Sequence, residues 1–214
     1  MAKRRSGQRV SAAARAGSQK QRRQTLKFGG LGAAAFAVLA VVIVLAVGAI
    51  AGASNAPNFS FSLYQGVTEL GARDLELSQL RGQPVILNFW AGLCPPCRAE
   101  MPQFQQFFEE YRDQVTLVGV DIGPFVGLGS HRDAEDLLRE LGVTYPAGFT
   151  GDGGVPRKYD VTGMPTTVFI TSDGEIFERR AGAINRNTLV RLTTDMLRAE
   201  KEASQSAATL HSGS

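Results

Sequence analysis

The chain has 214 residues, of which 43% are hydrophobic, and a net charge of +3. This length suits one ordinary domain with short extensions, and the hydrophobic content is normal for a chain that builds a core. The charge is unevenly distributed, because residues 1–27 carry nine Lys or Arg and no acid, whereas the rest of the chain sums to −6. The basic character belongs to the N-terminal tail, and no basic nucleic-acid-binding domain is indicated.

An apolar segment at residues 28–53 follows this basic tail. Residues 31–53 would measure about 34 Å as a helix, against a hydrocarbon core of roughly 30 Å, so they can form a single transmembrane helix. Lys and Arg stay preferentially on the cytoplasmic side, so we expect a cell-membrane protein with a cytoplasmic N-terminus and an extracytoplasmic domain. The alternative is a cleaved signal peptide, although the apolar segment exceeds the roughly 7 to 15 residues of such signals. Residues 22–27 also weakly resemble a twin-arginine export signal.

The rest of the chain divides into three parts. Residues 54–58 are predicted to be a linker, 59–200 the folded domain, and 201–214 a Ser- and Ala-rich disordered tail. Phe59 to Tyr64 alternates with the period of a half-buried strand, and a small hairpin through Leu77 is expected. No internal repeat is evident.

The central elements follow in chain order. Val85 to Trp90 is a nearly continuous apolar run, typical of a strand covered on both faces. A helix is predicted next, because apolar residues recur at spacings of three and four from Met101 to Tyr111. Five further elements are predicted from the same patterns and from the hairpin signal Asp173-Gly174: strands at 115–120, 166–171 and 176–181, and helices at 133–141 and 187–199. This order predicts an α/β fold of thioredoxin-like type, with a central mixed sheet flanked by helices.

The two cysteines, Cys94 and Cys97, open the predicted helix of residues 101–111. A disulfide that closes so short a loop stabilises a fold little, so the spacing indicates chemistry. The N–H groups and the dipole at a helix start favour a thiolate, which predicts that Cys94 is the nucleophile and that Cys97 resolves the mixed disulfide. Pro95 and Pro96 restrict the loop between them. Zinc is the alternative for such a pair, but the only other soft ligands are His131 and His211, so no metal is expected.

The segment from Asn88 to Pro102 resembles the active-site segment of the TlpA/ResA family of membrane-anchored, extracytoplasmic thioredoxin-like proteins, within the redoxin superfamily. A second signature of that family is matched by Gly163-Met164-Pro165-Thr166-Thr167, and the resemblance covers roughly residues 57–199. It implies that Met164-Pro165 is a cis peptide bond that faces the dithiol, and that Met164, Pro165 and Thr166 bind an extended substrate peptide. An ordinary trans proline is the alternative.

The resemblance also assigns roles within the first segment. A glutamate at the position of Glu100 influences proton transfer at the cysteines in such proteins, and a buried carboxyl group with a raised pKa could exchange protons with Cys97. The alternative is a solvated glutamate in the first helical turn. Asn88 replaces the acid of thioredoxin itself, and Trp90 is expected beneath the active-site loop. Leu93 departs from the family, which usually has Trp there, so partner specificity is expected to differ.

The segment 121–131 is longer and more apolar than the matching segment in the family that the chain resembles. We expect Phe125 and Leu128 to pack onto the core, with a partner-contact loop as the alternative. His131 is expected to be a surface or helix-cap residue rather than a ligand.

Three functions remain open at this point. The resemblance favours a thiol-disulfide oxidoreductase that reduces extracytoplasmic protein disulfides, with apocytochrome c as a candidate substrate and a membrane thiol carrier as electron donor. It needs no cofactor besides the redox-active disulfide Cys94–Cys97. A thiol peroxidase is the second hypothesis, although peroxiredoxins have Thr where this chain has Ala91. A non-catalytic copper carrier is the third, although those proteins use a longer cysteine spacing.

Overall fold

The computed structural model describes residues 54–212, without the side chains of 210–212. The predicted basic tail and membrane anchor lie outside these residues. Among residues 54–212, no helix has the length and apolar character needed to cross a membrane.

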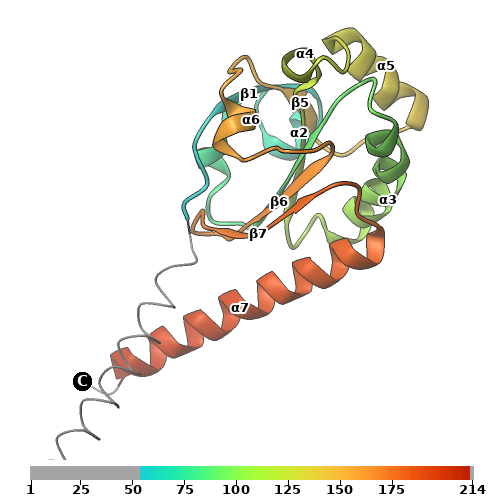
Figure 1. The fold of residues 1–214 in the computed structure, drawn as a ribbon. Coiled ribbons are helices and arrows are strands. Elements are labelled where there is room, and N and C mark those ends of the chain that lie inside the picture. The colour runs from blue at the N-terminus through green and yellow to red at the C-terminus, as the bar shows by residue number, and fades with distance from the viewer. Residues whose placement is uncertain (1–53, 213–214) are drawn as a thin grey trace, which may run out of the picture. The chain divides into compact units, whose positions relative to one another are not determined.

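A mixed sheet of seven strands forms the centre of the described residues, in the order β2-β1-β5-β4-β3-β6-β7 (Figure 1). β3 is parallel to β4 and antiparallel to β6, and β4 is parallel to β5. The strands are β1 (Ser60–Gln65), β2 (Asp74–Glu76), β3 (Val85–Trp90), β4 (Thr116–Asp121), β5 (Ala147–Phe149), β6 (Thr166–Ile170) and β7 (Ile176–Ala181). The predicted hairpin near the domain start is confirmed as the antiparallel pair β1–β2.

Helices connect these strands, and the last helix, α7, follows β7 and extends away from the sheet (Figure 1). They are α2 (Val67–Leu70), the 3-10 helix η1 (Leu77–Leu80), α3 (Pro95–Tyr111), α4 (Gly123–Val126), α5 (His131–Leu141), α6 (Val155–Lys158) and α7 (Arg186–Ser212). The thioredoxin-like α/β class predicted from the sequence is confirmed by this arrangement. β5 and the short helices α2, α4 and α6 were not predicted.

β3 is buried along its whole length and separates two apolar clusters. Because successive side chains of a strand point to opposite faces, Ile86 and Trp90 face one cluster while Leu87 and Phe89 face the other. The first cluster also contains the buried faces of α3, α5 and α7, and the second contains residues from β1, β2 and α6. The predicted two-sided burial of this strand is confirmed.

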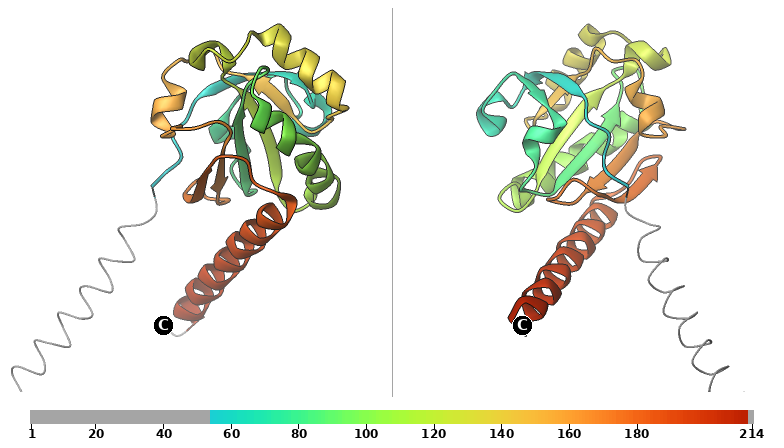
Figure 2. Two further views of the ribbon diagram at one scale, coloured as in Figure 1. Left: turned by 45° about the vertical axis from the view of Figure 1, so that its right-hand side comes forward. Right: turned by 90° about the vertical axis from the view of Figure 1, so that its left-hand side faces the viewer.

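The two ends of the folded domain differ from the prediction. The expected linker 54–58 is hydrogen bonded to the β6–β7 hairpin, since Ala56 N donates to Gly174 O at 2.8 Å and Ile176 N donates to Ser54 O at 2.9 Å. The prediction of a disordered tail from residue 201 is wrong, because α7 continues to Ser212 (Figure 2). Residues 199–208 are mainly Ala, Glu, Lys, Gln and Ser, without Gly or Pro, and this composition permits a solvated helix.

Candidate active site

The dithiol lies at the start of α3, directly after the central strand β3. Cys94 and Cys97 form a disulfide, and both residues are almost fully buried, with 2% and 0% exposure. Cys94 is the N-cap residue of α3, and the two prolines that follow it occupy the first helical positions. Proline is favoured there because its missing N–H would have no helical partner. The predicted placement of the cysteines at a helix start is confirmed.

The two prolines also decide which backbone donor faces the sulfur of Cys94. Because Pro95 and Pro96 have no N–H, the first donor of α3 is the N–H of Cys97, which donates to Cys94 Sγ at 3.3 Å. The next one, Arg98 N, donates to the carbonyl oxygen of Cys94 at 3.0 Å. A negative charge on Cys94 Sγ would therefore be stabilised by one direct hydrogen bond and by the helix dipole.

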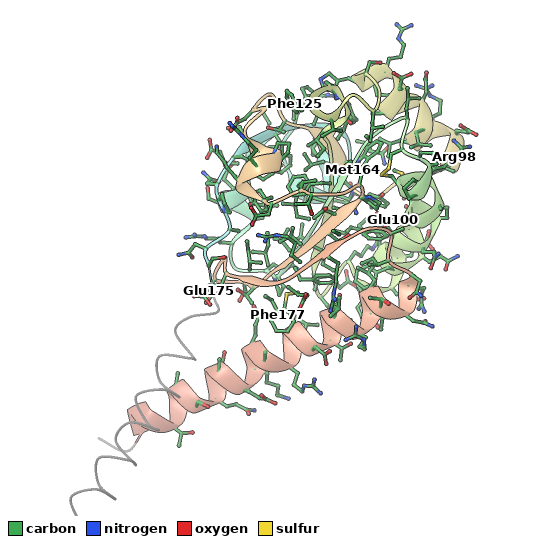
Figure 3. All side chains as sticks on the ribbon, viewed as in Figure 1. Arg98, Glu100, Phe125, Met164, Glu175 and Phe177 are labelled. Carbon is green, nitrogen blue, oxygen red and sulfur yellow. A yellow bond between two sulfur atoms is a disulfide. The ribbon has the colours of Figure 1, made fainter. Side chains whose placement is uncertain are left out.

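Met164-Pro165 is a cis peptide bond, as the resemblance predicts. In the antiparallel pairing of β3 with β6, Phe89 is opposite Thr166. The end of β3 and the start of β6 therefore lie at the same edge of the sheet, where the dithiol loop leaves β3. Met164 is partly buried and packs against the cluster that contains both cysteines. Figure 3 shows Met164, Arg98 and Glu100 around the disulfide.

Glu100 is buried behind the dithiol, with 2% exposure, rather than solvated. Its Oε1 accepts a hydrogen bond from Asn88 Nδ2 at 2.8 Å, and its Oε2 accepts one from the backbone N of Ile184 at 3.0 Å. Burial disfavours the charged form and raises the pKa of Glu100 to about 7, against the lowering effect of these two hydrogen bonds. Glu100 can therefore take up or release a proton near neutral pH.

Asn88 connects Glu100 to the sheet. Its Nδ2 also donates to Thr167 Oγ1 at 3.1 Å, on the neighbouring strand β6. Its Oδ1 is buried without a hydrogen-bond partner in the described part of the chain. If the Asn88 amide were reversed, Oδ1 would accept a hydrogen bond from protonated Glu100. Asn88 can therefore form a hydrogen bond with Glu100 in either protonation state of the carboxyl group.

Trp90 is fully buried and belongs to the apolar cluster that also contains both cysteines. Its carbonyl oxygen accepts from Ile122 N at 2.9 Å, which ties β3 to the segment after β4. Its indole Nε1 is close to Gly119, where an added Cβ would lie 2.9 Å from it. The glycine thus leaves room for the indole.

Segment 121–131 was predicted only in part. Leu128 is partly buried against the core cluster, as expected, but the prediction for Phe125 is wrong, since its side chain is 41% exposed. Phe125 belongs to the single helical turn α4, which ends at Val126 and is capped by Gly127 with a φ of 70°, and this turn leaves the Phe125 side chain on the outside. His131 is the first residue of α5, next to its N-cap Ser130, as the helix-cap prediction implies.

Asp121 holds both ends of this segment. Its buried carboxylate accepts from Gly123 N at 2.8 Å and from Tyr64 Oη at 3.1 Å, and it lies 3.1 Å from His131 Nδ1. Burial raises the pKa of Asp121, and these partners lower it. The cluster of Tyr64, Asp121 and His131 was not predicted from the sequence, because its members are 10 to 67 residues apart.

The comparisons with known proteins agree with this geometry. Residues 53–179 match the AhpC/TSA family. Thiol-disulfide oxidoreductase ResA of Oceanobacillus iheyensis is 36% identical over 130 residues, which are 60% of this chain and 65%, just under two thirds, of that protein. ResA of Geobacillus kaustophilus is 30% identical over 144 residues, which are 67% of this chain and 76% of that protein.

A solved structure shares the fold as well. StoA from Bacillus subtilis aligns with a TM-score of 0.54 and 27% identity over 64% of this chain and 97% of that one. The chain therefore belongs to the AhpC/TSA family, among the ResA-type thiol-disulfide oxidoreductases of thioredoxin fold.

Proposed function

We propose that this chain is an extracytoplasmic reductase of protein disulfides. The observation that carries the proposal is the position of Cys94, whose sulfur accepts the first free N–H of α3 at the sheet edge where cis Met164-Pro165 lies. In the reduced enzyme, the Cys94 thiolate attacks a partner disulfide, and one partner sulfur leaves as a thiolate. Cys97 then attacks Cys94 Sγ and releases the second partner sulfur, which leaves the Cys94–Cys97 disulfide.

Each cycle transfers two electrons to the partner, and the second attack requires that Cys97 lose its proton. Glu100 is one helical turn after Cys97, is buried, and has a pKa near 7, which makes it the acceptor for that proton. Asn88 positions Glu100 through the hydrogen bond to Oε1. Met164, Pro165 and Thr166 line the edge on which an extended substrate peptide would lie.

The proposed location rests on the sequence of residues 1–53. The basic tail and the apolar stretch together favour a single membrane anchor that leaves the domain outside the cytoplasm. A reductase in that location must be recharged after each cycle, so we include a membrane thiol carrier as electron donor. The resemblance to ResA favours apocytochrome c, with its own pair of cysteines, as a substrate.

The test is the reduction of insulin by the full-length protein with a dithiol as electron source. We expect insulin to be reduced by the wild-type protein and not by Cys94→Ser. Labelling of intact and permeabilised cells with a membrane-impermeant thiol reagent tests the location, because an extracytoplasmic Cys94 is labelled in both. If the protein does not reduce insulin but rapidly consumes peroxide, the thiol peroxidase hypothesis replaces this proposal.

A further inference from the structure

The carboxyl group of Asp121 is buried at the end of β4, beside the strand that leads to the dithiol. In the parallel pairing of β3 with β4, Asp121 is opposite Trp90, the last residue before the loop 91–94 that carries Cys94. The residue is fully buried, which is costly for a carboxyl group unless it is hydrogen bonded. Both of its oxygens have partners, and each oxygen is connected to this loop by a separate route.

The first route is the segment that follows β4. Asp121 Oδ1 accepts a hydrogen bond from Gly123 N at 2.8 Å. The carbonyl oxygen of Gly123 accepts from Leu128 N at 3.0 Å, and that of Leu128 accepts from Leu93 N at 2.8 Å. Three successive hydrogen bonds therefore connect Asp121 to the residue directly before Cys94.

The second route is the start of α5, which Figure 1 shows beside α4. Asp121 Oδ2 accepts from Tyr64 Oη at 3.1 Å and lies 3.1 Å from Nδ1 of His131, the first residue of α5. The backbone of α5 packs directly against the loop, since a Cβ added at Gly92 would lie 2.5 Å from Ala134 N. Asp121 thus holds the helical turn that contacts Gly92.

The partners of Asp121 are themselves held in place. Tyr64 Oη lies 2.7 Å from His131 Nδ1, so the two side chains contact each other as well as the carboxyl group. The Phe149 ring packs against both, with ring centroids 5.2 Å from Tyr64 and 4.4 Å from His131. The cluster therefore joins β1, β4 and α5 through fixed side chains.

The stabilisation of a thiolate at Cys94 depends on where this loop holds the sulfur. The hydrogen bond from Cys97 N to Cys94 Sγ, at 3.3 Å, joins the loop to the helix. A hydrogen bond weakens steeply when its distance and angle are lost, and a thiolate is less favoured when its N–H donor moves away. Small displacements of Gly92 and Leu93 should therefore change the reactivity of Cys94.

We propose that Asp121 is a positioning residue for Cys94. Its two oxygens hold Leu93 and Gly92 so that Cys94 Sγ stays at the first free N–H of α3. This inference rests on the proposed function and adds a residue that acts through hydrogen bonds, without touching a reacting atom. An effect of its charge would have the opposite sign, because a nearby carboxylate disfavours a thiolate.

The test compares the pH profiles of Cys94 alkylation by iodoacetamide in the reduced, full-length protein, with mass spectrometry identifying the alkylated residue. Asp121→Ala removes both routes. Its rate constant should be on the order of tenfold below that of the wild type in the acidic part of the profile, as expected for one weakened hydrogen bond to a charged group. At the alkaline plateau, where Cys94 is a thiolate in both proteins, the two rate constants should be similar.

The matched variant is Asp121→Asn, because its amide oxygen still accepts from Gly123 N and its amide nitrogen can donate to Tyr64 Oη. Its profile should coincide with that of the wild type. Glu100 behind the dithiol is present in every variant, so the comparison of profiles removes its contribution. Val155→Ala, in the apolar cluster on the other side of β3, controls for a general loss of stability and should leave the profile unchanged.

Tyr64→Phe removes a single hydroxyl group and should shift the profile in the same direction as Asp121→Ala, by a smaller factor. It provides the test if thermal unfolding shows that Asp121→Ala does not fold. An unchanged profile in the variant that folds, or equal shifts in Asp121→Ala and Asp121→Asn, would overturn the positioning role while the reductase function stands. If Cys94 of the wild-type protein fails to react at any pH, the reductase function itself is refuted.

Discussion

Glu100 imposes a pH-dependent cost on the stability of the fold, which the substitution Glu100→Gln removes. The ordinary carboxyl pKa of 4.5 is raised by burial to about 7 in the folded chain. Between these two values the folded state binds more protons than the unfolded state, so the free energy of unfolding decreases as the pH rises from about 4.5 to about 7. Below this window both states are protonated at Glu100, and the cost disappears.

The magnitude follows from the difference between the two pKa values. Since each pH unit of that difference corresponds to about 1.4 kcal/mol, the full cost above the window is roughly 3 kcal/mol. In Glu100→Gln, the amide oxygen can accept from Ile184 N, and the amide nitrogen can donate to the unpartnered Asn88 Oδ1 after reversal of the Asn88 amide. The reversed Asn88 Nδ2 then takes the buried place where Oδ1 had no partner, as it would beside a protonated Glu100, so Gln reproduces the hydrogen bonds of the protonated carboxyl group without its charge.

The assay is urea unfolding of the oxidised protein near pH 8 and near pH 4, with the disulfide intact so that neither cysteine titrates. We expect Glu100→Gln to be more stable than the wild type by up to roughly 3 kcal/mol near pH 8 and about equal to it near pH 4. The matched control is Glu109→Gln on the exposed face of the same helix, which should change stability by no more than about 0.5 kcal/mol at either pH. The reasoning is refuted if the difference between Glu100→Gln and the wild type is the same at both pH values.

Three further predictions follow from other contacts. Replacing Asn88 with Ala removes the hydrogen-bond donor to Glu100 Oε1, so the pKa of Glu100 should rise further. NMR titration of the Glu100 side-chain carboxyl carbon measures this pKa, and an unchanged value would contradict the assigned hydrogen bond. Gly148→Ala should destabilise the fold by more than about 2 kcal/mol, because its Cβ would lie 2.1 Å from the carbonyl oxygen of Ser62. The control Gly151→Ala should destabilise the fold much less, because an added Cβ there has no heavy atom within 4 Å. Equal losses of stability in denaturant unfolding would show that β1 does not pack closely on β5. Ending the chain after Glu200 should lower the helical circular dichroism signal but change the free energy of unfolding by no more than about 0.5 kcal/mol, because residues 201–209 are exposed. A larger decrease in the free energy of unfolding would show that this part of α7 makes a stabilising contact.

The features that the sequence predicted are those that depend on a local pattern. The nearly continuous apolar run of β3, in which Asn88 alone is polar, predicts a strand buried on both faces. The two cysteines before an apolar helical repeat predict a dithiol at a helix start. The cis bond at Met164-Pro165 was implied by a motif resemblance, and the register of β6 with β3 explains how a motif 70 residues away reaches the dithiol edge.

The features that the sequence did not predict depend on contacts between distant residues. β5 has three residues, and its place in the sheet depends on Gly148, which allows the Ser62 backbone of β1 to approach. The exposure of Phe125 depends on where α4 ends, and an apolar side chain alone does not indicate which way a single helical turn faces. The cluster of Tyr64, Asp121 and His131 joins three separate elements, and no short window of sequence contains it.

Trapping with Cys97→Ser tests most directly whether Cys94 exchanges bonds with protein disulfides. Without the resolving thiol, the mixed disulfide between Cys94 and the attacked protein cannot be released, so it should accumulate and be detected by mass spectrometry as a link through Cys94. The matched Cys94→Ser variant should form no such adduct under the same conditions. If the Cys97→Ser protein keeps Cys94 as a free thiol in the presence of excess protein disulfide, the account of this site is contradicted.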